Sequence, residues 1–189
     1  MRSLDSSSPQ TILAVCFGNL CRSPMAEALL RADLPETSWC VLSAGTHAIE
    51  GDPPTPGAHD AIYRLRRLDM SHQRSAALTV DLLRRSDHVF TMSRMQALEA
   101  AALFPPAAPR IRLLGAFAPA ADAAGGPADP YGGQADSMEI ADPMGGDDEA
   151  YEACCSRLDT SVQAVVEWLN DGAAPAAAPT AVSHWLEGP

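Results

Sequence analysis

The sequence has little positive charge. Its 13 Lys and Arg residues are outnumbered by 24 Asp and Glu residues, which gives a net charge of −11 at pH 7. Such a chain repels nucleic acid and anionic lipid at long range, so neither is an expected partner. If this acidic protein binds phosphate, it must build a local positive field from backbone N–H groups and one or two arginines.

The sequence also lacks a long apolar run. No stretch approaches the roughly 20 apolar residues of a membrane span, and residues 1–10 are polar, unlike a signal peptide. The cysteines are odd in number and lack metal-ligand spacing, which favours reduced thiols. We therefore expect a cytoplasmic protein, monomeric, without metal or cofactor. The five cysteines are Cys16, Cys21, Cys40, Cys154 and Cys155.

The composition of the chain is that of a folded globular protein. Hydrophobic residues make up 47% and charged residues 20% of its 189 residues, which suits one domain with a sizeable core. Segments rich in Ala, Gly and Pro lie at about 116–136 and at 171–189, and they are typical of a loop and a tail. We expect a polar tail over residues 1–10 and the domain over 11–170.

Apolar segments alternate with helical patterns along this domain. Continuous apolar runs are typical of strands that are buried on both faces of a parallel sheet. The pattern predicts an α/β fold in which a doubly wound, four-stranded parallel sheet forms three layers with helices on both faces. The expected strands are 12–17, 40–44, 88–92 and 110–114, and the expected helices are 24–32, 57–68, 82–85, 94–103 and 148–169.

A short loop follows the first predicted strand. It runs Cys16-Phe17-Gly18-Asn19-Leu20-Cys21-Arg22 and is followed by Ser23 and Pro24, a good N-cap and a good first helical residue. Gly and Asn suit the left-handed backbone of a curled loop. Such a loop turns its N–H groups inward and binds an anion at the helix N-terminus. The sequence therefore predicts a phosphate-binding loop after strand 1.

Cys16 and Arg22 are the candidate reactive groups of this loop. A helix N-terminus and a nearby cation stabilise the nucleophilic thiolate of a cysteine, and Ser23 can donate a hydrogen bond to it. The planar guanidinium of Arg22 can bind two phosphate oxygens at once, which a lysine does poorly. The pattern predicts phosphoryl transfer to Cys16.

The run from Cys16 to Glu27 resembles the low-molecular-weight protein tyrosine phosphatase family. The resemblance extends through residues 43–46, 71–72, 87–89 and 142–143. It implies a phosphatase of phosphorylated proteins or peptides that works through a cysteinyl-phosphate without metal. It also implies that Asn19, Ser43 and His72 brace the loop by hydrogen bonds.

Two Asp-Pro pairs compete to supply the acid that protonates the leaving oxygen. Asp142 comes shortly before the last predicted helix, where the family carries this acid, whereas Asp129 lies farther back beside the Ala, Gly and Pro segment. Asp142 is therefore favoured. Asp129 stays open because an aromatic residue, Tyr131, follows its Asp-Pro pair, as in many family members.

The substrate class depends on residues where the sequence departs from the family. Members that act on phosphotyrosine flank the site with aromatic walls, and here those positions hold Ile49 and Met144. Relatives that act on phosphoarginine typically carry Thr where this loop has Leu20. We expect phosphotyrosine as substrate, with phosphoarginine as the alternative.

Three further interpretations concern the same loop. Arsenate reductases of this fold use two additional cysteines, but Cys154 and Cys155 fit ordinary helix positions better. A phosphate-binding or phosphopeptide-binding module without catalysis is the alternative from another class, and it would need no acid at Asp142. Cys21 is a candidate redox partner, because a neighbouring thiol can trap an oxidised Cys16 as a disulfide.

Overall fold

The computed structural model of the chain describes residues 9–118 and 138–171. Asp129, nearly all of the two predicted tails and nearly all of the predicted loop at 116–136 lie outside these residues. Residue 10 does not belong to a tail, because it begins the first strand.

Four parallel strands form the central sheet, in the order β2-β1-β3-β4. They are β1 (Gln10–Cys16), β2 (Trp39–Gly45), β3 (His88–Thr91) and β4 (Ile111–Leu113). The apolar strand β1 lies in the interior of the sheet, and its residues from Ile12 onward are buried. The predicted parallel sheet is confirmed, and the order of its strands reverses direction beside β1, which is where doubly wound sheets bind ligands.

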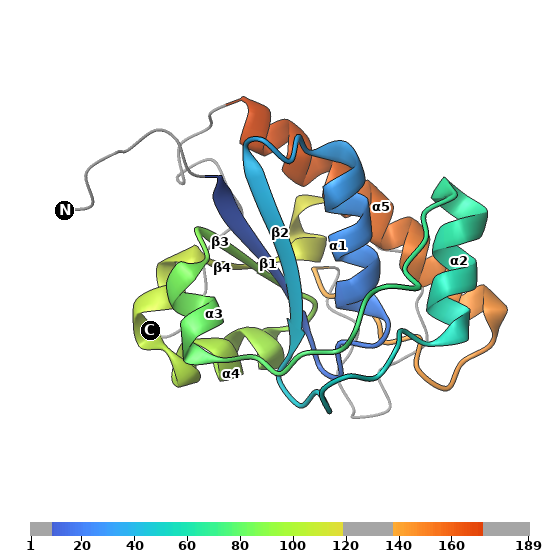
Figure 1. The fold of residues 1–189 in the computed structure, drawn as a ribbon, viewed down its shortest axis with the longest axis horizontal. Helices are drawn as coiled ribbons and strands as arrows, with labels where there is room; N and C mark the ends of the chain where they lie inside the picture. The colour runs from blue at the N-terminus through green and yellow to red at the C-terminus, as the bar shows by residue number, and fades with distance from the viewer. Residues whose placement is uncertain (1–8, 119–137, 172–189) are drawn as a thin grey trace.

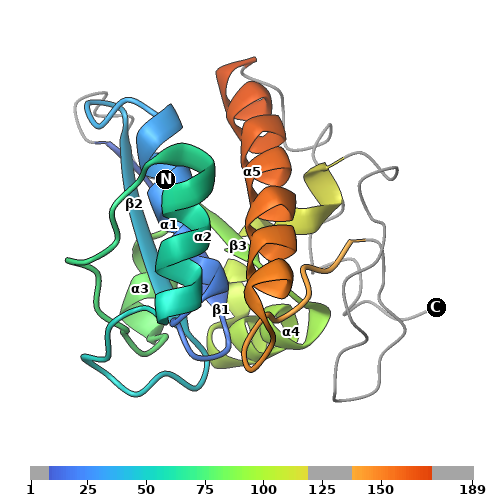
Figure 2. The same ribbon diagram turned by 90° about the vertical axis from the view of Figure 1, so that its right-hand side faces the viewer.

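Helices cover both faces of the sheet (Figures 1 and 2). The helices α1 (Arg22–Asp33), α2 (Pro56–Arg66) and α5 (Asp148–Asn170) share one apolar core with alternate residues of β1. The helices α3 (Val80–Arg85) and α4 (Arg94–Leu103) pack with the other residues of β1 in a second core. The three-layer α/β fold that the sequence predicts is therefore confirmed.

Two 3₁₀ helices were not predicted, at Pro105–Arg110 and at Leu114–Phe117. The first carries Pro105, Pro106 and Pro109, and proline removes hydrogen-bond donors that a longer α-helix would need. The helix α2 ends two residues before the predicted Leu68, because Arg67 takes a left-handed conformation with φ of 56°. These differences leave the sheet unchanged.

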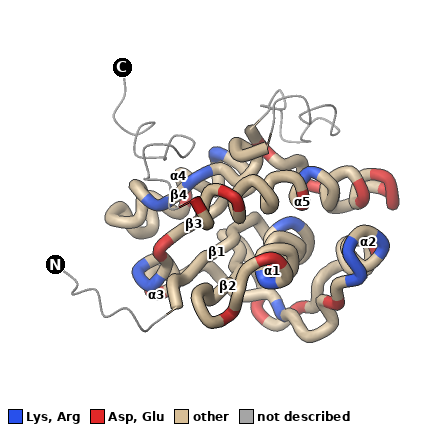
Figure 3. Tube along the Cα trace, turned by 90° about the horizontal axis from the view of Figure 1, so that it is seen from above, with Lys and Arg blue, Asp and Glu red and all other residues tan. Residues whose placement is uncertain are grey.

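Ion pairs join the helices of the first face. The Arg66 guanidinium lies 2.5 Å from carboxylate oxygens of both Asp33 and Asp159, and so links α2 to α1 and α5. Arg64 adds pairs to Asp148 and Glu152 in the first turns of α5, where Figure 3 shows the basic side of α2 beside acidic residues.

None of the helices within residues 9–118 and 138–171 combines the length and the apolar character that a membrane span requires.

Candidate active site

The loop after β1 lies at the carboxyl edge of the sheet. Cys16 ends β1 and Arg22 begins α1, so five residues connect them. The Cys16 and Phe17 carbonyls accept hydrogen bonds from the N–H groups of Thr46 and His47, both 2.9 Å long. Gly45 permits this contact, since a Cβ atom there would lie 2.5 Å from the Phe17 carbonyl oxygen. The end of β2 therefore holds the start of the loop in place.

Asn19 is the centre of a buried hydrogen-bond network. Its backbone is left-handed, with φ of 54°, as the sequence predicts for a curled loop. Its side-chain amide donates to the hydroxyls of Ser23 and Ser43, each at 2.9 Å, and accepts from the N–H of Ala76 at 2.8 Å. The Ser43 hydroxyl in turn donates a hydrogen bond to a Glu27 carboxylate oxygen at 2.6 Å. Both N–H groups and the oxygen of the Asn19 side-chain amide are thereby used.

The Cys16 sulfur receives two polar contacts from this network. The Asn19 N–H donates to Sγ at 3.2 Å, and the Ser23 hydroxyl lies 3.0 Å from it. Ser23 accepts from Asn19, so its single proton can point either to Sγ or to the Ala44 carbonyl at 3.2 Å. A thiolate would attract this proton, because hydrogen bonds to a charged acceptor are stronger.

The predicted N-cap at Ser23, with the helix beginning at Pro24, is wrong by two residues. The helix begins at Arg22 with Cys21 at the N-cap, and no side chain caps it. Ser23 is buried inside the first turn, where its hydroxyl faces Cys16 instead of the helix N–H groups. The polar residue that suggests a cap from sequence is used here to hold the sulfur.

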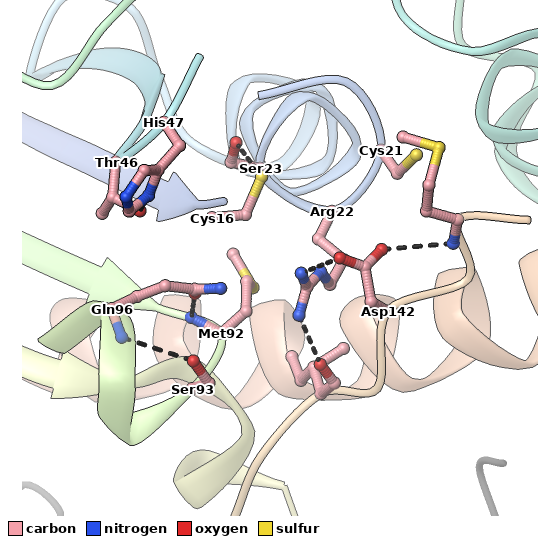
Figure 4. A network of polar contacts seen from close by, with 12 residues as sticks. Cys16, Cys21, Arg22, Ser23, Thr46, His47, Met92, Ser93, Gln96 and Asp142 are labelled. Atoms are coloured by element: carbon pink, nitrogen blue, oxygen red, sulfur yellow. Dashed lines mark hydrogen bonds and ion pairs between the residues drawn. The ribbon is translucent and has the colours of Figure 1, made fainter. Parts of the chain in front are cut away.

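Arg22 and Asp142 lie against each other beside the loop (Figure 4). One guanidinium nitrogen donates to a carboxylate oxygen of Asp142, and another donates to the Ile140 carbonyl at 3.1 Å. The second carboxylate oxygen of Asp142 accepts from the Met144 N–H at 3.2 Å. Cys16, Leu20, Arg22, Asp142 and Met144 line one pocket together with Gly18 and Cys21. The structure thus brings the predicted acid to the predicted nucleophile.

Cys21 also faces buried groups of other elements. Its sulfur lies 3.2 Å from the Thr55 hydroxyl and 4.0 Å from the Tyr151 hydroxyl. Burial raises the pKa of the Cys21 thiol to about 11. Burial likewise raises the pKa of Cys155 to about 12 and that of Cys154 well above its usual value. Thiolate attack by these three residues is therefore unfavourable at neutral pH.

The structure does not place His72 where the resemblance implies. His72 is exposed, and among the described residues it makes no hydrogen bond to the loop. The next residue, Gln73, reaches the start of α1 instead and donates to the Pro24 carbonyl at 3.2 Å. Sequence reasoning also missed Glu27 and Ala76, which hold Ser43 and Asn19. A carboxylate on the buried side of a predicted helix could have indicated Glu27.

The predicted wall residues are both exposed. Ile49 is 76% exposed and Met144 is 50% exposed, and only Met144 lines the pocket with Cys16. The exposed Phe17 ring stacks on His47, with centroids 4.5 Å apart.

Within residues 9–118 and 138–171, no three His, Cys, Asp or Glu side chains lie close enough together to hold a metal ion.

Known proteins share this sequence pattern. The family model described as low molecular weight phosphotyrosine protein phosphatase matches residues 11–174. A probable low molecular weight protein-tyrosine-phosphatase, EpsP of Ralstonia solanacearum, is 44% identical over 96 residues, which are 51% of this chain and 64% of that relative. The match thus spans less than two thirds of that relative. The protein-arginine-phosphatase of Geobacillus stearothermophilus is 32% identical over 85% of this chain and 97% of its own length.

Solved structures share the fold. The tyrosine phosphatase AmsI of Erwinia amylovora aligns with a TM-score of 0.70 and 27% identity, over 88% of this chain and 95% of that chain. The arginine phosphatase YwlE of Geobacillus stearothermophilus aligns with a TM-score of 0.70 and 31% identity, over 87% and 95%. Because the family model covers the whole described domain, including the loop and Asp142, the chain belongs to the low molecular weight phosphotyrosine protein phosphatase family.

Proposed function

We propose that this protein hydrolyses phosphotyrosine in proteins or peptides through a cysteinyl-phosphate on Cys16, without metal. The observation that carries the proposal is the pair of contacts on the Cys16 sulfur, from the Asn19 N–H at 3.2 Å and the Ser23 hydroxyl at 3.0 Å. A buried core cysteine has no need of two polar contacts. A nucleophile and leaving group does, because both contacts stabilise its thiolate.

In the first step the substrate phosphate enters the loop. Arg22 exchanges the Asp142 carboxylate for two phosphate oxygens, which match its planar fork. The Cys16 thiolate attacks phosphorus, an S–P bond forms and the bond to the tyrosyl oxygen breaks. Asp142, released from Arg22, takes up a proton from solvent and gives it to that oxygen, since a phenolate with a pKa near 10 is a poor leaving group.

In the second step Asp142 works as a base. Its carboxylate takes a proton from water while the water oxygen attacks phosphorus, and the S–P bond breaks. The electron pair returns to the Cys16 sulfur, where Ser23 and the Asn19 N–H stabilise the thiolate. Inorganic phosphate leaves, and Arg22 can return to Asp142. The network around Asn19 already holds the Ser23 hydroxyl and the Asn19 N–H against the Cys16 sulfur.

The most direct test presents phosphotyrosine, phosphoserine and phosphoarginine peptides without added metal. We expect turnover of phosphotyrosine, and a loss of at least about 10⁴-fold in Cys16→Ser, because an alkoxide forms far less readily than a thiolate. Wild-type turnover that this substitution leaves intact would contradict the mechanism.

The alternative substrate is phosphoarginine. The Geobacillus relative supports it, and the relatives named tyrosine phosphatases, together with the bulky Leu20 in the loop, support phosphotyrosine. Leu20→Thr should raise the ratio of phosphoarginine to phosphotyrosine turnover. If the wild-type enzyme already turned over phosphoarginine faster than phosphotyrosine, phosphoarginine would be its substrate and the proposal would be wrong on this point.

Asp142→Ala separates an enzyme from a phosphate-binding module. In an enzyme the substitution lowers turnover of poor leaving groups by about 10²–10⁴-fold, whereas activated aryl phosphates are less affected. In a binding module it leaves binding intact and there is no turnover to lose. Asp129→Ala is the matched control. If turnover fell more in Asp129→Ala than in Asp142→Ala, Asp129 would be the acid.

We further propose that Cys21 protects an oxidised Cys16. Hydrogen peroxide converts the Cys16 thiolate to a sulfenic acid, and the Cys21 thiol condenses with it to a disulfide and water. Cys21 faces Thr55 and Tyr151, and burial there raises the pKa of its thiol to about 11. Its side chain must therefore turn out of this buried setting and toward Cys16 before it reacts. Wild-type activity should return with thiol reductant after peroxide, and Cys21→Ser should recover less. Equal recovery would refute this role.

The cellular setting is part of the same proposal. We place the protein in the cytoplasm as a monomer. All five cysteines are unpaired, which suits a reducing compartment. Cell fractionation and light scattering of the purified protein test the two statements separately.

A further inference from the structure

A second cluster of polar side chains lies toward the amino ends of the strands, away from the catalytic loop. His88 is the first residue of β3, and Trp168 lies near the end of α5. Arg112 lies on the edge strand β4 in register with Phe90, which faces the α5 side of the sheet. The His88 and Trp168 ring centroids are 5.3 Å apart, and the Arg112 Cζ atom is 5.6 Å from the Trp168 centroid. We call these three residues the Arg112 cluster.

The buried nitrogen atoms of this cluster have no hydrogen-bond partner among the described residues. They are Arg112 Nε, His88 Nδ1 and Trp168 Nε1. Arg112 is only 4% exposed, and within residues 9–118 and 138–171 no carboxylate pairs with its guanidinium. Its position over the Trp168 ring is a favourable cation–π contact, but a ring face does not replace partners for the N–H groups. A buried unpaired charge is strongly unfavourable unless a counter-ion joins it.

The chemistry of the three groups selects the kind of partner. Arginine and tryptophan side chains carry donors only, so neither can bind a cation or another donor. Burial, followed by the nearby Arg112 charge, lowers the pKa of His88, which keeps its imidazole neutral at pH 7. The cluster therefore offers one positive charge and N–H donors on three side chains. An oxyanion, with several acceptor oxygens and a negative charge, satisfies all of them.

We propose that Arg112, His88 and Trp168 form a second oxyanion site, separate from the catalytic loop, which binds a small tetrahedral anion such as inorganic phosphate. The proposal does not depend on the catalytic function. If the protein is a phosphatase, the anion is also its product, and the second site responds to the concentration of free phosphate.

The first test measures thermal unfolding in phosphate and in chloride at equal ionic strength. The Arg22→Ala background removes the clamp of the catalytic loop, so that phosphate binding there does not contribute. Phosphate at ten times its dissociation constant should raise Tm by about 3–6 °C. Arg112→Met should abolish this rise, and in chloride it should be as stable as its parent or more so.

Arg84→Met is the matched control. The Arg84 Cζ atom also lies 5.6 Å from an aromatic centroid, that of Phe104, but Arg84 is exposed and paired with Asp81. This variant should keep the full phosphate response. An equal phosphate response in Arg112→Met and its parent would overturn the proposal, and so would a loss of stability in chloride without a change in the response.

The second test detects the contact itself. The Trp168 indole N–H signal, assigned by its absence in Trp168→Phe, should shift saturably when inorganic phosphate is added to the Arg22→Ala protein. Trp168→Phe keeps a ring but removes one donor, so it should weaken phosphate binding several-fold even if Arg112→Met does not fold. An indole signal that stays in place, or an affinity that Trp168→Phe leaves unchanged, would overturn the site.

Discussion

The catalytic loop and the Arg112 cluster differ in how their polar groups are satisfied. At the loop, both amide N–H groups and the carbonyl oxygen of the Asn19 side chain have partners, and these bonds hold Ser23 and Ser43. In the Arg112 cluster, three buried nitrogen atoms have no partner among the described residues, and at the loop only Arg22 Nε is in the same position. The groups around the Cys16 sulfur are thus organised before a ligand arrives, whereas the cluster, like Arg22, still has donors for one. Preorganisation of this kind favours catalysis, because little reorganisation remains for the transition state.

Among the substitutions that test this comparison, the largest effect is expected for Arg22→Lys. A lysine keeps the charge but cannot bind two phosphate oxygens in one plane, so kcat/KM should fall by about 10²–10³-fold. Steady-state kinetics on a phosphotyrosine peptide measures the loss. A fall of less than threefold would show that charge alone suffices, and that the fork geometry of Arg22 adds nothing.

Asn19→Ala should disrupt the hydrogen-bond network that organises the catalytic loop. It removes three hydrogen bonds and leaves the partly buried Ala76 N–H without its side-chain partner, so unfolding should require about 2–3 kcal/mol less. Denaturant unfolding measures this loss, and kcat should fall with it. Asn19→Asp is the control of equal size, and because it cannot donate to Ser23 and Ser43 it should also be impaired. Stability equal to wild type in both would mean that the network does not hold the loop.

The same substitution at two arginines sharpens the contrast. Arg66→Met removes a guanidinium paired with Asp33 and Asp159 and should destabilise by about 1–2 kcal/mol, because it leaves two partly buried carboxylates uncompensated. Arg112→Met removes a guanidinium that has no carboxylate partner within residues 9–118 and 138–171, and it should be neutral or stabilising in chloride. Both are compared by urea unfolding. If the order of the two variants were reversed, pairing would not decide their stability.

The smallest effect is a pH dependence. The pKa of Cys21 is raised by burial from 9.0 to about 11 in the folded protein, so the folded state favours the protonated thiol. The stabilisation is complete below pH 9 and is lost as the pH rises from 9 to 11. Cys21→Ala should make the fall in stability over this range less steep, while Cys40→Ala, which changes an exposed thiol, should not. Equal slopes in both variants would contradict a buried Cys21.

Sequence reasoning succeeded where a local pattern determines the structure. The apolar run of β1 and the Gly18-Asn19 turn predicted a buried strand and a curled loop, because burial and left-handed backbone restrict the residue types. It placed the N-cap of α1 at Ser23, since from sequence a serine that holds a sulfur cannot be distinguished from one that caps a helix. His72 was misplaced because its role came from resemblance, and a short shift along the chain puts Gln73 near α1. Glu27 was missed because its partner, Ser43, lies on another element.

The contact between Arg22 and Asp142 has a consequence for selectivity among cellular anions. The Asp142 carboxylate competes with any incoming anion, which must displace it before the anion can bind the Arg22 guanidinium. A singly charged ion such as chloride or acetate resembles that carboxylate at best and has little to gain from the exchange. A phosphate monoester brings a second negative charge and more oxygens, and so it can win. The resting loop is in this way screened from abundant weak anions without being closed to its substrate.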